Sequence, residues 1–202
     1  MSRGVDPDQR RVELAEAVFA VIRRDGINSA SVRAVAAEAG WTRGVIGHYF
    51  ADRDDLLLYA YRVAIRDTCD LVRAETRTLG PLPALQFALS QLLPVNERSR
   101  VNFQIWLGFM GRVADRPELG RSVLREHMEF RRLIGELVEA WLQAELLSVD
   151  ISSDALVEEI VVYVDGLGVA TALDLQTHSP VRLTGAIRDY LETCLVRLKA
   201  RI

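Results

Sequence analysis

The stretch SVRAVAAEAGWTRGVIGHYFADRDDL, residues 31–56, decides the fold of this chain of 202 residues. It is typical of two short helices separated by a turn. The segment NSAS (28–31) provides a cap for the first helix, and Gly40 ends it. Thr42 is a favourable N-cap for the second helix, which we expect to run to about Tyr49. Two short helices joined by a turn that contains glycine are the local pattern of a helix-turn-helix.

The second of these helices has two faces of different character, because side chains repeat every 3.6 residues along a helix. One face carries Thr42, Ile46 and Phe50, which can pack against Trp41 and the helix that precedes the motif. The opposite face carries Arg43, Gly44, Gly47 and His48. A glycine inside a helix costs about 1 kcal/mol relative to alanine, so the two glycines need an explanation.

Helical periodicity dominates the rest of the sequence, and no alternation typical of strands appears. The first helix begins at Asp6-Pro7 and ends at Gly26. Further helices are predicted at 53–76, 84–93, 98–114, from Pro117 to the loop at 148–154, at 155–175 and at 180–199. This pattern predicts an all-α protein of nine helices, with three short helices in residues 1–52 and six mostly longer helices in residues 53–202.

The composition is that of an ordinary globular protein, with 50% apolar residues, 26% charged residues and a formal net charge of −3. This net charge by itself does not indicate a nucleic-acid-binding protein. Cys69 and Cys194 lie far apart without metal-site spacing, which favours reduced thiols and a cytoplasmic location. The most apolar run, 160–175, contains Asp165 and Asp174 and is too short to span a bilayer, so no membrane association is expected.

The signatures of catalysis are missing from the sequence. There is no glycine-rich phosphate loop, no cysteine–histidine metal set and no G-x-S-x-G motif, and the three histidines lie far apart. The segment DRDDL (52–56) resembles the D-D-x-x-D motif of terpenoid-type enzymes only loosely, and it sits at a helix start. We therefore expect no enzyme activity, no metal site and no cofactor.

At residues 31–56 the sequence resembles the DNA-binding segment of the tetracycline-repressor (TetR) family. The resemblance extends over about residues 9–60, and it rests on Val32, Ala36, Ala39-Gly40, Thr42, Gly44, Tyr49-Phe50, Arg53 and Leu56. Residues 102–138 and 161–174 are similar, more weakly, to the ligand-binding domains of the betaine-pathway, choline-responsive branch of that family. This second similarity implies the architecture of the C-terminal domain more firmly than it implies choline.

The resemblance implies a homodimer whose third helices enter successive major grooves of a near-palindromic DNA operator. It implies that residues 1–52 form the helix-turn-helix domain and that residues 53–202 bind an effector and dimerise. Tyr49 and Arg53 match positions that reach phosphates, and Thr42 would cap its helix and also reach a phosphate. Arg43 is the best candidate for a base contact, because arginine bidentate to guanine is the commonest specific contact.

Two positions depart from the family pattern. Relatives usually carry threonine at the place of Val45 and an aromatic residue at the place of Gly47. Val45 offers a methyl contact to thymine but no hydrogen bond, so we expect base readout to shift to Arg43 and His48. Gly44 matches a family glycine, where a bare backbone lets the helix approach DNA closely. The expected DNA contacts are Arg33, Thr42, Arg43, Gly44, Val45, Gly47, His48, Tyr49 and Arg53.

Three arginines before the recognition helix have two interpretations. Arg10 and Arg11 on the first helix, and Arg33 on the second, are either solvated surface charges or phosphate contacts. For Arg33 we favour the phosphate contact, and for Arg10 and Arg11 both interpretations stay open.

An aromatic cluster in the middle of the chain also has two interpretations. Its members are core residues or, as the resemblance implies for some of them, they line an effector pocket between the middle helices. The candidates for effector binding are Phe103, Trp106, Phe109, Met110, His127, Phe130 and Asp165. Trp106 is the best candidate, since a tryptophan near carboxylates suits a quaternary ammonium compound or a polyamine through cation–π attraction. A flat apolar ligand is the alternative.

Asp165 is an isolated carboxylate in an apolar helix, and such groups are usually paired or functional when buried. It would bind a cationic ligand, hydrogen-bond a neighbouring helix or sit at the helix edge, and we favour a structural role at a dimer seam. Gly166 and Gly168 permit close helix approach. The helices at 155–175 and 180–199 are apolar enough to form a four-helix bundle with their copies from a second chain.

These observations and the resemblance predict a one-component transcriptional regulator, most simply a repressor. An activator is the alternative. The regulator forms a homodimer through its last two helices and binds double-stranded operator DNA. A small-molecule effector of unknown identity releases it from the DNA. The helix that begins at Arg53 joins the two regions and is the expected lever. The rival hypotheses are a helical small-molecule-binding module without DNA affinity and a regulator without an effector.

Overall fold

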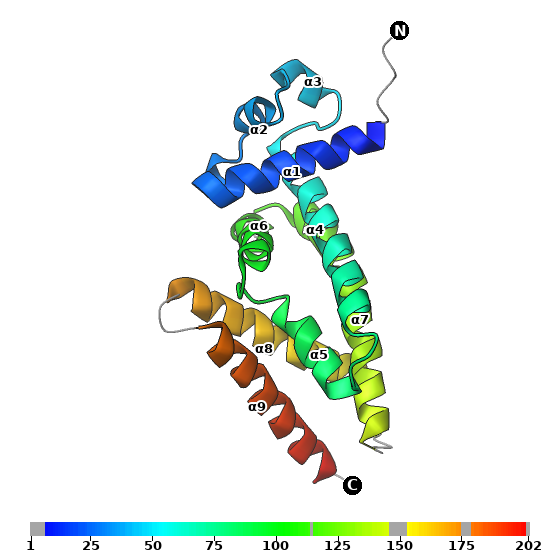
Figure 1. The fold of residues 1–202 in the computed structure, drawn as a ribbon. Coiled ribbons are helices and arrows are strands. Elements are labelled where there is room, and N and C mark those ends of the chain that lie inside the picture. Colours follow the sequence, from blue (N-terminus) through cyan, green and yellow to red (C-terminus); the bar gives the residue numbers. More distant parts are fainter. Residues whose placement is uncertain (1–6, 114, 146–152, 175–178, 201–202) are drawn as a thin grey trace. The chain divides into compact units, whose positions relative to one another are not determined.

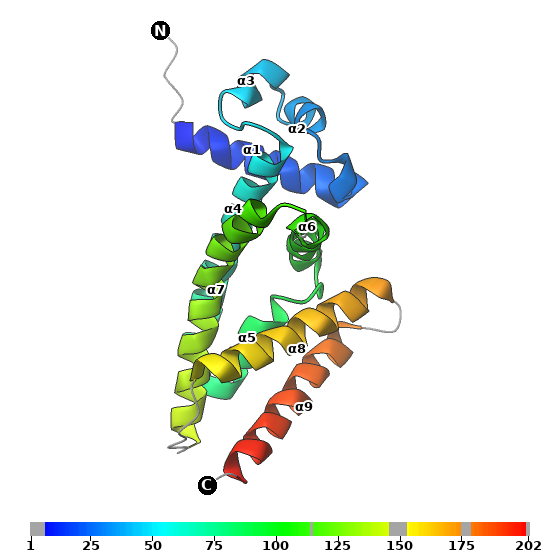
Figure 2. The ribbon, with the colours of Figure 1, turned by 180° about the vertical axis from the view of Figure 1, so that it is seen from behind.

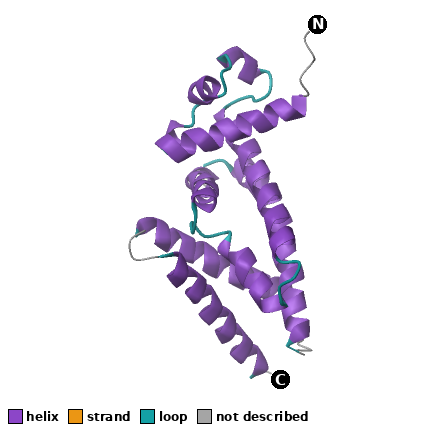
Figure 3. Ribbon diagram, viewed as in Figure 1, coloured by secondary structure: helices purple, strands orange, loops and turns teal. Residues whose placement is uncertain are grey.

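The structure, a computed structural model, describes residues 7–113, 115–145, 153–174 and 179–200. Within these ranges every regular element is a helix, which confirms the predicted all-α class (Figure 1 and Figure 3). The α-helices are α1 (Pro7–Asp25), α2 (Val32–Glu38), α3 (Arg43–Gly47), α4 (Arg53–Glu75), α5 (Pro81–Ser90), α6 (Glu97–Val113), α7 (Pro117–Ala144), α8 (Ser153–Leu173) and α9 (Pro180–Lys199). A short 3-10 helix, η1 (Ile27–Ser29), joins α1 to α2.

The predicted helix ends lie within three residues of the observed ones, and α5 and α3 illustrate the differences. α5 begins at Pro81 rather than at residue 84, because Gly80 is an extended N-cap and proline is well suited to the first helical position. α3 ends at Gly47 rather than near Tyr49, and His48 is its C-cap. The predicted loop at 148–154 and turn at 177–180 lie largely outside the described residues.

The chain divides into two compact units. Unit 1 comprises residues 1–66 and 104–127, and unit 2 comprises residues 67–103 and 128–202. α1, α2 and α3 belong to unit 1, whereas α5, α8 and α9 belong to unit 2. α4, α6 and α7 are each divided between the two units. The predicted domain boundary between residues 52 and 53 stays a prediction.

The apolar stripe of α1 forms the core of unit 1. Leu14, Val18 and Ile22 are buried, as their three- and four-residue spacing predicts. α2 packs on α1 and α3 on α2, so that α2 and α3 lie along one side of α1 (Figure 1). Ile46 and Phe50 are buried as well. This packing fixes α3 by one face only.

In unit 2, α8 and α9 run side by side (Figure 1 and Figure 2), and α5 packs on α9. Gly168 of α8 lies directly against the ring of Phe103. A Cβ added at Gly168 would lie only 2.5 Å from Cε2 of that ring, so the close contact requires glycine. The prediction of close approach is therefore confirmed for Gly168. A Cβ at Gly166 would meet no described atom of its own chain within 4 Å, so close approach at Gly166 stays a prediction for the dimer seam. None of the described helices combines the length and the apolar character needed to cross a membrane.

Candidate nucleic-acid interface

Capping hydrogen bonds define both helices of the motif. The Ser31 hydroxyl accepts a hydrogen bond from Ala34 N at 3.2 Å at the start of α2. The Thr42 hydroxyl accepts one from Val45 N at 3.4 Å at the start of α3. Gly40 turns the chain between them with φ 69°, in the left-handed region that favours glycine. The local sequence thus determines where each helix of the motif begins and how the turn is made.

The face of α3 opposite Ile46 is open to solvent. Its exposed residues are Arg43, Gly44, Gly47 and His48, as the helical period predicts. Thr42, which we expected to pack on the buried face, is exposed instead, because its hydroxyl turns back to cap the helix. The open face therefore presents a guanidinium, an imidazole and two positions of bare backbone.

Neither glycine of α3 is required by packing among the described residues. A Cβ at Gly47 would meet nothing within 4 Å, and a Cβ at Gly44 would meet only the Thr42 hydroxyl oxygen, at 3.9 Å. Each glycine destabilises the helix by about 1 kcal/mol relative to alanine. No packing contact within the described residues requires glycine at either position and so offsets this cost. The bare backbone is consequently available to an external surface.

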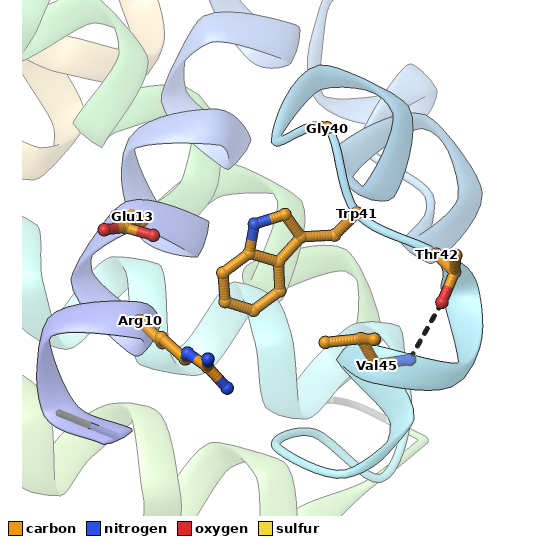
Figure 4. A pocket seen from close by; sticks show the side chains of 6 residues that line it. All are labelled: Arg10, Glu13, Gly40, Trp41, Thr42 and Val45. Carbon is orange, nitrogen blue, oxygen red and sulfur yellow. Dashed lines mark hydrogen bonds between the residues drawn. The ribbon is translucent and has the colours of Figure 1, made fainter. Parts of the chain in front are cut away.

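A hollow of about 470 Å³ lies beside the motif, and the indole of Trp41 stands in the middle of its lining (Figure 4). Its lining residues are Arg10, Glu13, Gly40, Trp41, Thr42 and Val45. The Arg10 guanidinium lies over the Trp41 ring, 5.6 Å from its centroid, and its Nη1 donates to the Tyr49 hydroxyl at 3.2 Å. The Trp41 and Tyr49 ring centroids are 6.1 Å apart. Arg10 is thus held beside the motif by Trp41 and Tyr49. The sequence did not indicate the contact between Arg10 and Trp41.

Arg53 contacts the backbone in front of α2. Its Nε donates to the Ala30 carbonyl at 2.8 Å, and its Nη2 donates to the Ile27 carbonyl at 2.6 Å. Burial, and the positive charge of Arg112, lower the pKa of Arg53. Arg53 therefore has a structural role in unit 1, while its predicted phosphate contact stays a prediction. Arg33 is exposed on α2, and its phosphate contact stays a prediction as well.

Four candidate effector residues lie in unit 1. Phe109 and His127 are buried, whereas Trp106 and Met110 are partly exposed. His127 Nδ1 and the hydroxyl of buried Tyr61 share a hydrogen bond of 2.8 Å, and the Tyr61 ring meets Phe109 edge-on with 6.1 Å between centroids. Sequence analysis missed Tyr61, because its partner is 66 residues away along the chain.

The other three candidates lie in unit 2. Phe103 and Phe130 are buried, and Phe103 covers Gly168 in the manner of a core residue. Asp165 is half-buried, and burial raises its pKa to about 6 against the opposing influence of the Arg131 charge. Effector binding by the residues of either unit stays a prediction.

Two sequence families match this chain. Residues 81–196 match the family described as BetI-type transcriptional repressor, C-terminal, and residues 14–60 match the family described as bacterial regulatory proteins, tetR family. The chain belongs to the TetR family of transcriptional regulators. Its predicted character as a helix-turn-helix, ligand-responsive repressor of that family is thereby confirmed.

Individual TetR-family relatives support this membership. The regulator PksA of Bacillus subtilis is 28% identical over 198 residues, which cover 97% of this chain and 95% of PksA. The regulator BetI of Stenotrophomonas maltophilia is 33% identical over 123 residues, which cover 59% of this chain and 61% of BetI. A solved structure of a putative regulator from Saccharomonospora viridis, in complex with choline, has a TM-score of 0.77 and 20% identity, and the match covers 92% of this chain and 96% of that one.

Membership of the TetR family determines the class of partner. Regulators of this family bind DNA operators and typically dimerise, and the relatives of this chain are transcriptional regulators rather than enzymes. The open face of α3 lies inside the N-terminal match, and α8 lies inside the C-terminal match.

Proposed function

We propose that this TetR-family repressor acts in the cytoplasm, binds a near-palindromic operator as a homodimer and is released by a small-molecule effector. Residues 1–52 bind DNA, and residues 53–202 bind the effector and dimerise. The observation that carries the proposal is the open face of α3, where Arg43 and His48 are exposed beside two bare glycine positions. Effector binding favours a geometry in which the two α3 helices no longer match consecutive major grooves, about 34–36 Å apart. The coupling free energy is typically about 1–3 kcal/mol.

The proposed DNA contacts divide by chemistry. Arg43 reads guanine through a bidentate hydrogen bond, His48 reads a second base and Val45 contacts a thymine methyl group. Phosphate contacts set the register, and they come from Arg33, Thr42, Tyr49 and Arg53. Gly44 and Gly47 let the backbone of α3 come close to the groove, because neither position carries a side chain that would hold the helix away.

The dimer forms through α8 and α9. Along α8, small and apolar residues at three- and four-residue spacing form an exposed row: Val162, Gly166, Ala170 and Leu173. Val162 is 60% exposed, and on α9 Val181 is 80% exposed. Exposed apolar surface of this kind is typical of protein–protein contacts. Gly166 would admit a helix of the second copy, and Asp165 would lie at the edge of this seam.

The effector contacts residues among Phe103, Trp106, Phe109, Met110, His127, Phe130 and Asp165. A tryptophan ring and a carboxylate suit a cationic ligand. The S. viridis regulator, which has the same fold, was solved in complex with choline, so choline is the first probe. A polyamine and a flat apolar compound are the alternatives.

A binding titration tests the proposal. Duplex DNA from the region upstream of the gene is labelled, and its fluorescence anisotropy is measured against protein concentration at two salt concentrations, with and without choline. Operator binding should weaken steeply with salt, because basic side chains release counterions from phosphates. Absence of salt-sensitive binding would favour the helical binding module without DNA affinity. A melting temperature that no cation, polyamine or aromatic compound shifts would favour a regulator without an effector.

A further inference from the structure

Two adjacent residues at the start of α4 bind different elements of unit 1. Arg53 donates to the carbonyls of Ile27 and Ala30, which belong to the turn in front of α2. Asp54 is only 8% exposed and accepts hydrogen bonds from two arginines at the end of α6 and the start of α7. The first turn of α4 is therefore attached on one side to the helix-turn-helix motif and on the other side to α6 and α7.

The Asp54 carboxylate accepts three hydrogen bonds from guanidinium groups. Arg112, in the last turn of α6, donates from Nη1 to Oδ1 and from Nη2 to Oδ2, the latter at 2.7 Å. Arg116, directly before α7, donates from Nη1 to Oδ2 at 2.7 Å. Charge-assisted hydrogen bonds with bidentate geometry are both strong and directional. The position of the end of α6 is thus tied to the first turn of α4.

A second contact joins α6 to the same turn without passing through α4. Gly108 precedes Arg112 by four residues and so lies on the same face of α6. A Cβ at Gly108 would lie 3.2 Å from Cγ1 of Ile27, which places the α6 backbone directly against that side chain. Ile27 is held by α6 through its side chain and by Arg53 through its carbonyl. The contacts form a closed ring.

We propose that Asp54 is a positioning residue that makes the end of α6 and the turn in front of α2 move as one body. A displacement of α6 is then transmitted to the start of the recognition motif instead of being absorbed between them. Loss of the carboxylate leaves the Arg112 and Arg116 charges without their partner, which opens the ring on the α4 side. The use of this coupling in effector response rests on the proposed function, since α6 also contributes residues to unit 2.

A second ion pair in unit 1 provides a matched control. Arg62 of α4 donates from Nε and Nη2 to the two carboxylate oxygens of Glu126 in α7, at 2.8 and 2.7 Å. This pair has the same bidentate chemistry and also starts from α4. It lies more than two turns farther along α4 than Asp54, and the hydroxyl of the adjacent Tyr61 shares a hydrogen bond with Nδ1 of His127 in α7. Breaking it should loosen α4 from α7 without affecting that turn.

Residue-resolved amide hydrogen exchange on the full chain, without DNA and without effector, tests the coupling. The reporters are the amides of Ser29 and Ala30, which donate to the carbonyls of Gly26 at 3.1 Å and Ile27 at 3.2 Å. In Asp54→Asn both amides should exchange about tenfold faster, although Asp54 contacts neither of them, because local opening of the turn becomes easier. In Arg62→Gln the same two amides should exchange at the wild-type rate.

The opposite pattern would overturn the proposal: wild-type exchange at Ser29 and Ala30 in Asp54→Asn, with faster exchange confined to the end of α6. If Asp54→Asn loses its helical circular dichroism, Arg116→Gln decides, with Arg116→Lys as its charge-retaining partner. Arg116→Gln should speed exchange of the two amides and Arg116→Lys should not, and equal rates in both would reject the coupling. Since neither DNA nor effector is present, the result does not depend on whether the proposed function is correct.

Discussion

The guanidinium of Arg10 lies over the indole ring of Trp41, 5.6 Å from its centroid, and so links the start of α1 to the turn of the helix-turn-helix. The same guanidinium donates to the hydroxyl of Tyr49. Trp41 therefore contacts both Arg10 and Tyr49, and Tyr49 is one of the proposed phosphate contacts. This arrangement makes Trp41 a supporting residue of the interface, although its own ring is half-buried.

Replacing Trp41 with alanine should weaken operator binding about three- to tenfold, since a cation–π contact contributes about 0.5–2 kcal/mol. If Arg10 and Tyr49 face phosphates, the preference for operator over random duplex should not change, because phosphate contacts carry no sequence information. Trp41→Phe keeps an aromatic ring beside Arg10 and should retain most of the affinity. Anisotropy titrations with both duplexes measure these effects, and equal binding by the alanine variant and the wild type would show that Arg10 needs no such support.

Replacing Arg43 with alanine should reduce operator affinity by about 1–3 kcal/mol and leave affinity for random duplex much less affected. The reason is that a base contact is lost, whereas the phosphate contacts remain. Arg77→Ala removes one exposed arginine beyond the end of α4 and serves as the control for net charge. Competition of labelled operator with random duplex separates the two roles, and an equal loss for both duplexes would identify Arg43 as a phosphate contact.

Replacing Gly44 with alanine should raise the stability of the free protein by about 0.5–1 kcal/mol, because the added Cβ has room and alanine favours a helix. The same change should weaken operator binding if the bare backbone lies against DNA. Gly47→Ala, at the other end of α3, is the matched comparison. Thermal melting and anisotropy titration give the two quantities, and unchanged operator binding in both variants would mean that neither glycine faces the groove.

Replacing Gly168 with alanine should lower the melting temperature, because the new Cβ would lie 2.5 Å from the buried ring of Phe103. Phe103→Leu in the same chain should recover part of the loss by making room.

In Gly166→Ala the added Cβ meets no described atom of its own chain, so this change should leave unit 2 folded. Its effect is expected on the dimer instead, as a rise in the dissociation constant measured by sedimentation, and an unchanged dimer would place Gly166 outside the seam.

The pKa of Asp165 predicts a pH dependence of stability. Burial raises this pKa from 3.8 to about 6, so the folded chain binds the proton more tightly than the unfolded chain. The contribution of Asp165 to stability is therefore most favourable below pH 3.8, and it declines as pH rises towards 6. Asp165→Asn should stabilise the protein at about pH 7.5, and the gain should shrink towards pH 4.

Denaturant unfolding across this pH range measures that trend. Asp189→Asn, an exposed carboxylate on α9, controls for the loss of one negative charge. A stability difference between Asp165→Asn and the wild type that stays constant with pH would show that the carboxylate does not titrate differently in the folded state.

The helices could be predicted because their signals are local. Ser31 and Thr42 cap the helices that directly follow them, and Leu14, Val18 and Ile22 repeat at the helical period. The open face of α3 followed from the same period. Thr42 was placed on the wrong face because a capping side chain turns towards its own backbone, which a helical wheel does not represent.

The supporting contacts of the site could not be predicted, because they join residues that are distant in sequence. Arg10 and Tyr49 are 39 residues apart, and Asp54 and Arg112 are 58 residues apart. No periodicity or spacing indicates which arginine will pair with which acceptor. Arg53 illustrates the same limit, since its match to a phosphate-contacting position gave no indication of its bonds to Ile27 and Ala30.

Unit 1 is assembled from two separate stretches of sequence, because residues 104–127 belong to it together with residues 1–66. A single genetic crossover directly after α3 would therefore transfer Ile27 without Arg53 and Gly108, which contact it. Exchange of DNA-binding domains between relatives would replace one side of these contacts unless both stretches moved together. New operator preferences are more accessible to such a protein through point substitutions on the open face of α3, where Arg43 and His48 can change without disturbing any buried contact.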